Sequence, residues 1–196
     1  MPASPTILIL AAGASSRMQG RDKLLEPVEG QPILARITRA ALETGCPVRV
    51  VLPPGRPLRL AALAGLPVQT VICENAAEGM AASLACGVAA CPEADILLLL
   101  ADLPEIGADD LEAMLIARKA HPGRILRACA EDGTAGHPVL FPAALRAKLL
   151  SLKGDEGART LLRAPDQPVI AVPLPGRRAV TDLDTPEDWA AWRASR

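Results

Sequence analysis

Aromatic residues and a surplus of basic residues are both missing from this sequence. Its 196 residues include one Phe, two Trp and no Tyr, and the formal net charge is −1 at pH 7. Single-stranded nucleic acids stack their bases on aromatic side chains, and nucleic-acid-binding surfaces carry clustered Lys and Arg. Here Lys and Arg are scattered along the chain. We therefore expect no nucleic-acid partner.

Paired cysteines and long apolar runs are also missing. The chain has no CxxC pair, and an odd, scattered set of cysteines is typical of reduced thiols in the cytoplasm rather than of disulfides or zinc sites. No basic stretch precedes the first apolar run, as it would in a secretory signal. No apolar run approaches about 20 residues, the length of a membrane span. The five cysteines are Cys46, Cys73, Cys86, Cys91 and Cys129. We expect a cytoplasmic protein without membrane association.

What the sequence does contain is a regular alternation of apolar runs and helical patterns. Half of its residues are hydrophobic, enough for a substantial core, and the length suits a single domain over residues 1–196. Most connections contain Gly or Pro, which interrupt helices and strands. The alternation predicts an α/β fold with a mostly parallel sheet, helices on both faces and a small antiparallel addition in the later half.

The expected elements follow from these patterns. Strands are expected at Ile7–Leu10, Val48–Leu52, Val68–Cys73, Ile96–Leu100, Ile125–Ala130, Val139–Phe141 and Val169–Val172. Helices are expected at Ile33–Glu43, Arg59–Leu63, Met80–Ala90, Ala108–Ala120, Ala143–Ser151, Ala158–Ala164 and Pro186–Ala194. Ligands bind such sheets at the carboxyl ends of the strands, so the candidate ligand-binding loops are Ala11–Lys23 and Ala101–Pro104.

The first of these loops has the composition of a phosphate site. The strand Ile7–Leu10 is followed by small residues, Ala11 to Ser16, and then by Arg17 and Lys23. Small residues let the backbone approach a ligand closely, backbone N–H groups can cradle phosphate oxygens, and two cations can neutralise them. The loop matches neither GxGxxG nor the GxxxxGKS/T pattern, so an ordinary tight turn is the alternative.

The second loop follows the most apolar strand, Ile96–Leu100, which delivers Asp102 to the edge of the sheet just before Pro104. A carboxylate beside a phosphate site is suited to Mg²⁺, a hard ion that prefers oxygen ligands. The alternative is a cap for the helix that starts near Ala108. Asp102 lies several residues too early for that cap, which Gly107 fits better, so Asp102 is a candidate metal ligand.

A third acidic segment precedes the last expected helix. Asp182 and Asp184 alternate along an extended stretch, so we expect them to point to opposite faces, with one facing the site. Thr185 before Pro186 is a good helix start, and capping also accounts for Asp188. Capping does not account for Asp182.

Other polar positions have both a structural and a ligand-binding interpretation. His137 is either a loop histidine hydrogen-bonded to backbone or a substrate contact. Asp155 and Glu156 either open a helix or help to bind an acceptor. Ser83 can touch a ligand at the start of its helix, whereas Met80 is expected to pack.

Six segments in order resemble one enzyme family. They are LAAGASSRM with Lys23, then Glu78-Gly-Met, LLADLP, GHPVLF, GDEGAR and DLDTPED, and they extend from Thr6 to Trp189. This set is similar to the nucleotidyltransferases that finish the molybdenum cofactor, and more closely to their cytidylyltransferase branch. The resemblance implies a Rossmann-like α/β fold and an NTP substrate with Mg²⁺. It also implies transfer of a nucleoside monophosphate to a phosphorylated small molecule, here molybdopterin, with release of pyrophosphate.

The resemblance also assigns roles to individual residues. Arg17, Lys23 and Asp102 correspond to catalytic residues, and Asp102 with Asp182 corresponds to the metal site. The form Ala11-Ala12-Gly13 resembles the cytidylyl branch rather than the Ala-Gly-Gly of the guanylyl branch, so CTP is the expected nucleotide. The expected acceptor contacts are His137, Asp155 and Arg159. The expected nucleotide-binding residues are Leu10, Ala11, Ala12, Gly13, Ala14, Ser15, Ser16, Arg17, Lys23 and Ser83.

Two departures from the family pattern bear on function. Gln19 moves the lysine one place further along than in Arg-Met-Gly-x-x-Lys, and Ala135-Gly136 stands where relatives often carry an arginine before Gly-His-Pro. The second departure bears on recognition of the pterin substrate. Alternatives are a guanylyl or sugar-phosphate nucleotidyltransferase, and a non-catalytic nucleotide-binding chaperone for cofactor insertion. The resemblance implies a molybdoenzyme or a chaperone as protein partner.

Overall fold

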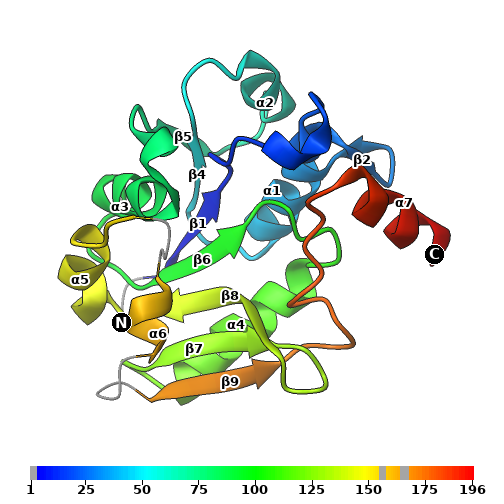
Figure 1. Ribbon diagram of the computed structural model, residues 1–196. Helices are drawn as coiled ribbons and strands as arrows, with labels where there is room; N and C mark the ends of the chain where they lie inside the picture. The colour runs from blue at the N-terminus through cyan, green and yellow to red at the C-terminus, as the bar shows by residue number, and fades with distance from the viewer. Residues whose placement is uncertain (1–3, 155–157, 164–167) are drawn as a thin grey trace.

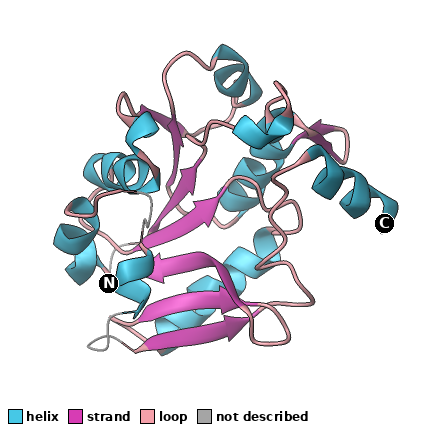
Figure 2. Ribbon diagram, in the orientation of Figure 1, coloured by secondary structure: helices cyan, strands magenta, loops and turns pink. Residues whose placement is uncertain are grey.

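A seven-stranded sheet forms the centre of the computed structural model, which describes residues 4–154, 158–163 and 168–196 (Figures 1 and 2). The strand order is β5-β4-β1-β6-β8-β7-β9. Neighbouring strands run parallel, except that β8 is antiparallel to both β6 and β7. The predicted α/β sheet with an antiparallel addition is therefore confirmed. The strands are β1 Thr6–Leu10, β4 Val48–Leu52, β5 Gln69–Ile72, β6 Ile96–Leu100, β7 Ile125–Cys129, β8 Ala135–Phe141 and β9 Val169–Pro173.

Helices cover both faces of this sheet. One buried cluster joins residues of α1, α4 and α7 to one face, and a second joins residues of α3, α5 and α6 to the other. A small hairpin, β2 Pro27–Val28 with β3 Gln31–Pro32, stands apart from the main sheet. The helices are α1 Ile33–Glu43, α2 Pro57–Ala62, α3 Met80–Ala90, α4 Ala108–Ala120, α5 Arg146–Leu150, α6 Arg159–Arg163 and α7 Pro186–Ala194. Short 3₁₀ helices lie at Ser16–Met18, Lys23–Leu25, Ala76–Glu78 and Ala143–Leu145.

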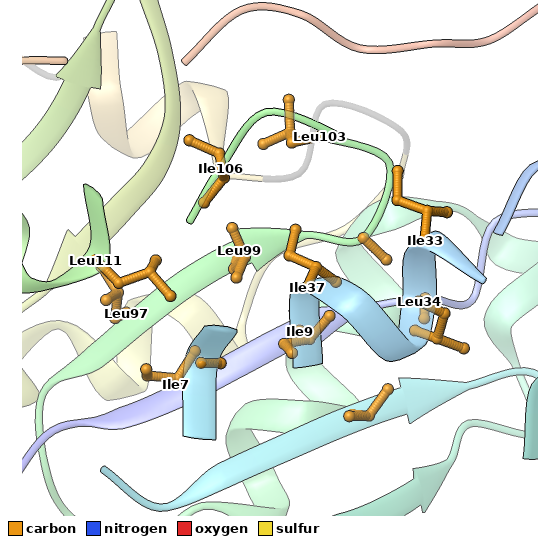
Figure 3. Close-up of a cluster of buried hydrophobic side chains, with 14 of the residues drawn as sticks. Ile7, Ile9, Ile33, Leu34, Ile37, Leu97, Leu99, Leu103, Ile106 and Leu111 are labelled. Atoms are coloured by element: carbon orange, nitrogen blue, oxygen red, sulfur yellow. The ribbon is translucent and has the colours of Figure 1, made fainter. Parts of the chain in front are cut away.

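The continuous apolar character of the central strands reflects burial on both faces. Successive side chains of a strand point to opposite faces, so Ile7 and Ile9 belong to the cluster on the α1 side and Leu8 belongs to the cluster on the α3 side. Figure 3 shows the first cluster, with Ile37 of α1 and Leu99 of β6 among its labelled members.

The helix starts agree with the capping signals in the sequence. The hydroxyl of Thr185 accepts a hydrogen bond from the Asp188 N–H at 3.1 Å, and the Asp188 carboxylate accepts one from the Thr185 N–H at 2.8 Å. At α4 the Gly107 N–H donates to Asp110 Oδ2 at 2.9 Å. These bonds satisfy backbone donors that the first helical turn leaves unpaired.

Several boundaries differ from the predictions. Strand β8 begins at Ala135, four residues before the predicted Val139, because pairing with β7 overrides the low strand propensity of Gly136 and Pro138. The hairpin β2–β3 was not expected, and the helix expected over 143–151 is a 3₁₀ turn followed by α5. None of the helices in the described ranges is long and apolar enough to cross a membrane.

Candidate active site

The candidate site lies at the edge of the sheet where β1 and β6 end and β8 begins. The loop after β1, the turn after β6 and the segment before α7 approach one another at this edge (Figure 1). A backbone hydrogen bond from the Leu183 N–H to the Asp102 carbonyl, at 3.4 Å, joins two of these segments. In open α/β sheets this edge is where ligands bind.

Lys23 is the centre of an ion-pair cluster at this edge. Its Nζ donates to Asp102 Oδ2 at 2.5 Å and to Asp184 Oδ1 at 2.6 Å, and its side chain is only 14% exposed. Burial by itself lowers the pKa of Lys23, but the two carboxylates outweigh it and the net shift is upward. Arg17, which is exposed, completes the cluster with a 2.7 Å contact to Asp184 Oδ2. The cluster therefore carries two permanent cations.

Asp22, the sequence neighbour of Lys23, belongs to a different cluster. Asp22 pairs with Arg59 of α2, at 2.7 and 2.9 Å. Arg59 is fully buried and also donates to the Ala11 carbonyl at 2.6 Å and to the Ser15 hydroxyl at 3.1 Å. Burial raises the pKa of Asp22, but the hydrogen bonds and charge of Arg59 lower it further, so its pKa is depressed. This cluster ties both ends of the loop 11–22 to α2.

Asp102 and Asp182 are the two candidate metal ligands. Asp102 Oδ1 is buried and has no hydrogen-bond partner, so this oxygen is chemically uncompensated. The pKa of Asp182 is raised, first by burial and then by the negative charges of Asp102 and Asp184. The prediction that Asp182 and Asp184 face opposite ways is wrong: both line the same cavity, because the segment is irregular rather than a strand. The described residues contain no ready group of three carboxylate, His or Cys ligands.

A cavity of about 580 Å³ lies over the loop after β1. Seven of the expected nucleotide-binding residues line this cavity: the five consecutive residues from Leu10 to Ala14, together with Lys23 and Ser83. Ser15 does not line it, since its hydroxyl hydrogen-bonds with Asp22 and Arg59, and neither does Ser16. Asp102 also lines this cavity. Sequence reasoning missed most of the other lining residues, which are Leu24, Pro53, Pro54, Arg56, Glu74, Ala76, Ala77, Gly79, Met80 and Leu100.

The Glu78-Gly-Met segment was the sequence signal for two of these missed cavity residues, Gly79 and Met80. Gly79 has φ 113° at the start of α3, a conformation that favours glycine, and it lies within the Glu78-Gly-Met segment. Met80 is 45% exposed and lines the cavity, so the expectation that it packs in the core is wrong.

A second cavity of about 510 Å³ adjoins the first. The two share Lys23, Met80, Leu100 and Asp102 in their linings. The second cavity is also lined by the expected metal ligand Asp182, by the expected acceptor contacts His137 and Arg159, and by Asp184. Arg17, expected among the nucleotide-binding residues, lines this second cavity and not the first. Asp155, the remaining expected acceptor contact, lies outside the described residues. The Lys23–Asp102 pair is thus the junction between two cavities.

His137 lies in the wall of the second cavity. Its N–H donates to the Ala179 carbonyl at 2.8 Å, and its Nδ1 is buried without a partner. Burial, followed by the charge of Arg127, lowers its pKa to about 4, so the imidazole is neutral near pH 7. Glycine is required at position 136, because a Cβ there would lie 2.0 Å from the Ala179 carbonyl oxygen.

Arg127 of β7 is a residue of this cavity that sequence reasoning missed. Its Nε donates to the Gly136 carbonyl at 3.0 Å, and its side chain lines the second cavity. The alternation of β7 was the available signal, because an arginine at an inward position of an apolar strand is unusual.

Comparison with known proteins places this chain in a family. The family model described as MobA-like NTP transferase domain matches residues 7–169. This range contains the loop after β1 and the ends of β6 and β7. The chain belongs to the MobA-like NTP transferase family, which is a family of nucleotidyltransferases.

Individual relatives differ in their named activities. A nicotine blue oxidoreductase of Paenarthrobacter nicotinovorans is 29% identical over 191 residues, which cover 93% of each chain. A probable molybdenum cofactor guanylyltransferase of Synechococcus elongatus is 29% identical over 192 residues, 95% of this chain and 97% of that one. The crystal structure of Rv0371c from Mycobacterium tuberculosis H37Rv has a TM-score of 0.87 at 27% identity and covers 99% of this chain and 100% of its own. A manganese complex of Rv0371c has a TM-score of 0.80 at 25% identity, with the same coverage.

Proposed function

We propose that this protein is a Mg²⁺-dependent nucleotidyltransferase that transfers CMP from CTP to a phosphorylated small molecule and releases pyrophosphate. The observation that carries the proposal is that two cavities meet at Lys23 and Asp102. A triphosphate in the first cavity and an acceptor phosphate in the second would meet at this junction. Membership of the MobA-like NTP transferase family supports an NTP as the donor.

The reaction joins two anions and needs no strong base. An oxygen of the acceptor phosphate attacks the α-phosphorus of CTP and forms a new P–O bond. The bond from that phosphorus to the oxygen bridging to the β-phosphate breaks, and pyrophosphate leaves. A phosphate monoester has a second pKa of about 6 and is already ionised near pH 7. His137, with its pKa lowered to about 4, is a weak base at this pH, and the reaction asks for none.

Charge neutralisation and positioning are therefore the contribution of this chain, as in phosphoryl transfer generally. Lys23 lines both cavities and keeps its proton, because its pKa is raised. It can approach the α-phosphate and the acceptor phosphate together. Arg17 lies on the second cavity, where its planar guanidinium can bind two phosphate oxygens at once.

Asp102 and Asp182 fit a divalent cation. Asp102 Oδ1 is buried without a partner, and both side chains line the second cavity. Mg²⁺ commonly takes one or two carboxylates together with phosphate oxygens of the substrate, so a preformed group of three protein ligands is not needed. The ion, when bound, would neutralise the triphosphate and stabilise the departing pyrophosphate.

CTP is proposed as the nucleotide because the run Ala11-Ala12-Gly13 resembles the cytidylyl branch of the family. The Ala11 N–H already donates to the Val51 carbonyl at 2.9 Å, and the Leu10 carbonyl accepts from the Ala101 N–H at 3.2 Å. The Ala11 carbonyl is bound by Arg59. These groups hold the loop, so contacts from the backbone to the base fall to Ala12 and the residues after it.

Competition between CTP and GTP for the first cavity tests this assignment. We expect CTP to bind more tightly, and the Ala12→Gly substitution to reduce the preference by removing a methyl group from the wall of the cavity. The change is expected to be about tenfold or less, the scale of one small apolar contact. A clear preference of the wild-type protein for GTP would instead support guanylyl transfer, in line with the relative named guanylyltransferase.

Molybdopterin is the proposed acceptor, and a molybdoenzyme or its chaperone is the proposed protein partner. We also propose a cytoplasmic location, which the five free cysteines support because reduced thiols are typical there.

Pyrophosphate release is the test of the function. The protein is incubated with Mg²⁺, molybdopterin and each of the four NTPs, and pyrophosphate is measured against time. Release that depends on both CTP and acceptor supports the proposal. Release with a sugar phosphate in place of molybdopterin would point to a sugar-phosphate nucleotidyltransferase. Nucleotide binding without any release would support the non-catalytic, chaperone-like alternative.

A further inference from the structure

The second cavity has a cationic end that the transfer reaction does not use. Leu126 and Ala128 of β7 lie in the core cluster on the α4 side, whereas Ile125 lies in the cluster on the α6 side. By alternation, Arg127 points to the α6 side of the sheet. Its Nε and Nη2 donate to the carbonyls of Gly136 and Ala135, at 3.0 and 3.4 Å. The guanidinium is thus held in place while its remaining N–H groups face the cavity.

Arg159 of α6 supplies a second guanidinium to the same cavity. In Figure 1 helix α6 lies in front of the part of the sheet that holds β7 and β8. Burial, and then the charge of Arg159, lowers the pKa of Arg127, which indicates that the two cations affect each other. Within the described ranges neither arginine forms an ion pair with a carboxylate. Arg127 is half-buried and Arg159 is exposed, and two neighbouring like charges beside a cavity repel each other until an anion joins them.

Four of the other charged groups of the cavity form ion pairs at its opposite end, while Asp182 forms none among the described residues. Asp102 and Asp184 pair with Lys23, and Arg17 pairs with Asp184. His137 is neutral near pH 7 because its pKa is lowered to about 4. Strand β8 separates β6 from β7, so the strand that carries Arg127 lies two strand spacings, about 10 Å, from the strand that precedes Asp102.

We propose that Arg127 and Arg159 bind a second anionic group of the acceptor, separate from the phosphate that reacts at Lys23. This inference rests on the proposed function for the position of the reacting phosphate. The acceptor is then a molecule with anions at two ends, and the second anion is a carboxylate or a phosphate. Molybdopterin has one phosphate and no carboxylate, so an acceptor with two such anions would take its place in the proposed reaction. Both offer paired oxygens that match the fork of a guanidinium.

A matched set of six-carbon phosphates tests the proposal by direct binding, without turnover. Glucitol 6-phosphate carries one anion, 6-phosphogluconate adds a carboxylate at the far end, and glucitol 1,6-bisphosphate adds a phosphate there. Dissociation constants are measured by calorimetry for the wild-type protein, Arg127→Gln and Arg159→Gln. Arg124→Gln is the matched control, because Arg124 is exposed and lies just before β7.

We expect the wild-type protein to bind at least one doubly anionic probe about tenfold more tightly than glucitol 6-phosphate, the scale of one charge-assisted contact. The probe that gains identifies the second anion as carboxylate or phosphate. Arg127→Gln and Arg159→Gln should each remove most of the gain, while Arg124→Gln keeps it. Equal or undetectable binding of all three probes by the wild-type protein, or a gain that survives both substitutions, overturns the proposal.

Two further readouts separate this result from other failures. If Arg127 only supported β8, Arg127→Gln would lower the melting temperature and weaken all three probes equally. CTP binding should be unchanged in each variant, because neither arginine lines the first cavity. A wild-type protein that binds no CTP would contradict the proposed function, while the comparison among the three probes would still be readable.

Discussion

Asp22 and Lys23 are neighbours in the chain, yet each forms ion pairs of a different kind. Asp22 is 11% exposed and its partner Arg59 is fully buried, so this pair is closed to ligands. Lys23 and its partners Asp102 and Asp184 are 14%, 17% and 21% exposed and line the cavities. The Asp22–Arg59 cluster holds the loop after β1 in place, and the Lys23 cluster presents its charges to a ligand bound in the cavities. The difference teaches that stability and chemistry can be assigned to adjacent residues.

The largest expected effect is on stability, in the closed cluster. Arg59→Met would leave the Asp22 carboxylate buried without its cation and should cost about 3–5 kcal/mol of unfolding free energy. Urea unfolding without nucleotide measures it. Arg39→Met is the control, because Arg39 is exposed on α1 and its loss should change stability by about 0.5 kcal/mol or less. A cost below about 1 kcal/mol for Arg59→Met would show that the closed cluster does not support the fold.

The open cluster should respond in activity instead. Asp102→Asn should keep the fold and lose about 100- to 1,000-fold in turnover, the scale of one lost transition-state contact. Pyrophosphate release at limiting Mg²⁺ measures it, with Asp109→Asn, an exposed aspartate in the first turn of α4, as the control. Near wild-type turnover for Asp102→Asn would remove Asp102 from the metal site.

Lys23→Ala should reduce turnover more than it weakens CTP binding, because Lys23 lies at the junction where charge shifts during transfer. A loss on the order of 100-fold in turnover is expected. Steady-state kinetics and a separate CTP titration measure the two quantities. Arg21→Ala is the control, since Arg21 pairs with Glu26 at 3.2 Å and is half-exposed. If Lys23→Ala changes neither rate nor affinity, Arg21 becomes the candidate cation.

The smallest expected effect is a difference in pH dependence. The pKa of Asp22 is lowered from 3.8 in the folded protein, so its contribution to stability is fully present above about pH 4 and is lost as pH falls through the folded pKa. The stability gap between the wild-type protein and Asp22→Asn should therefore be constant from pH 5 to 7 and narrow in more acidic solution. Unfolding free energies of both proteins, measured from pH 7 down into this acidic range, check whether the gap narrows as the pH falls. A gap that widens in acid would mean that Asp22 is not held ionised by Arg59.

Local patterns predicted much of the fold, and long-range contacts explain most of the rest. The helices Ile33–Glu43, Met80–Ala90 and Ala108–Ala120 have the expected bounds, since periodicity and capping are local signals. Strand β8 was predicted too short because its first residues include Gly136 and Pro138, and only pairing with β7 makes them a strand. The hairpin β2–β3 is only two residues long on each side, too short for a pattern.

The candidate site divides in the same way. The loop after β1 and Asp102 are visible because a strand followed by small residues or by a carboxylate is a local signal. The partners of Lys23 lie 79 and 161 residues away, and no spacing rule predicts them. The sequence has no arginine at 135 or 136, but the fold brings the guanidinium of Arg127 against those two residues.

The reversed direction of β8 has a consequence for how the site can diversify. The first cavity is walled largely by segments that follow parallel strands, whereas the second is lined by Arg127 of β7 and by four residues of the reversed strand β8, namely Ala135, Gly136, His137 and Val139. The hairpin 130–134 that joins β7 to β8 is exposed over residues 131–134. Substitutions at the lining positions of β7 and β8 can reshape the second cavity, the acceptor half under the proposed function, while the first cavity keeps its geometry. One scaffold can in this way conserve its donor chemistry and exchange its acceptor.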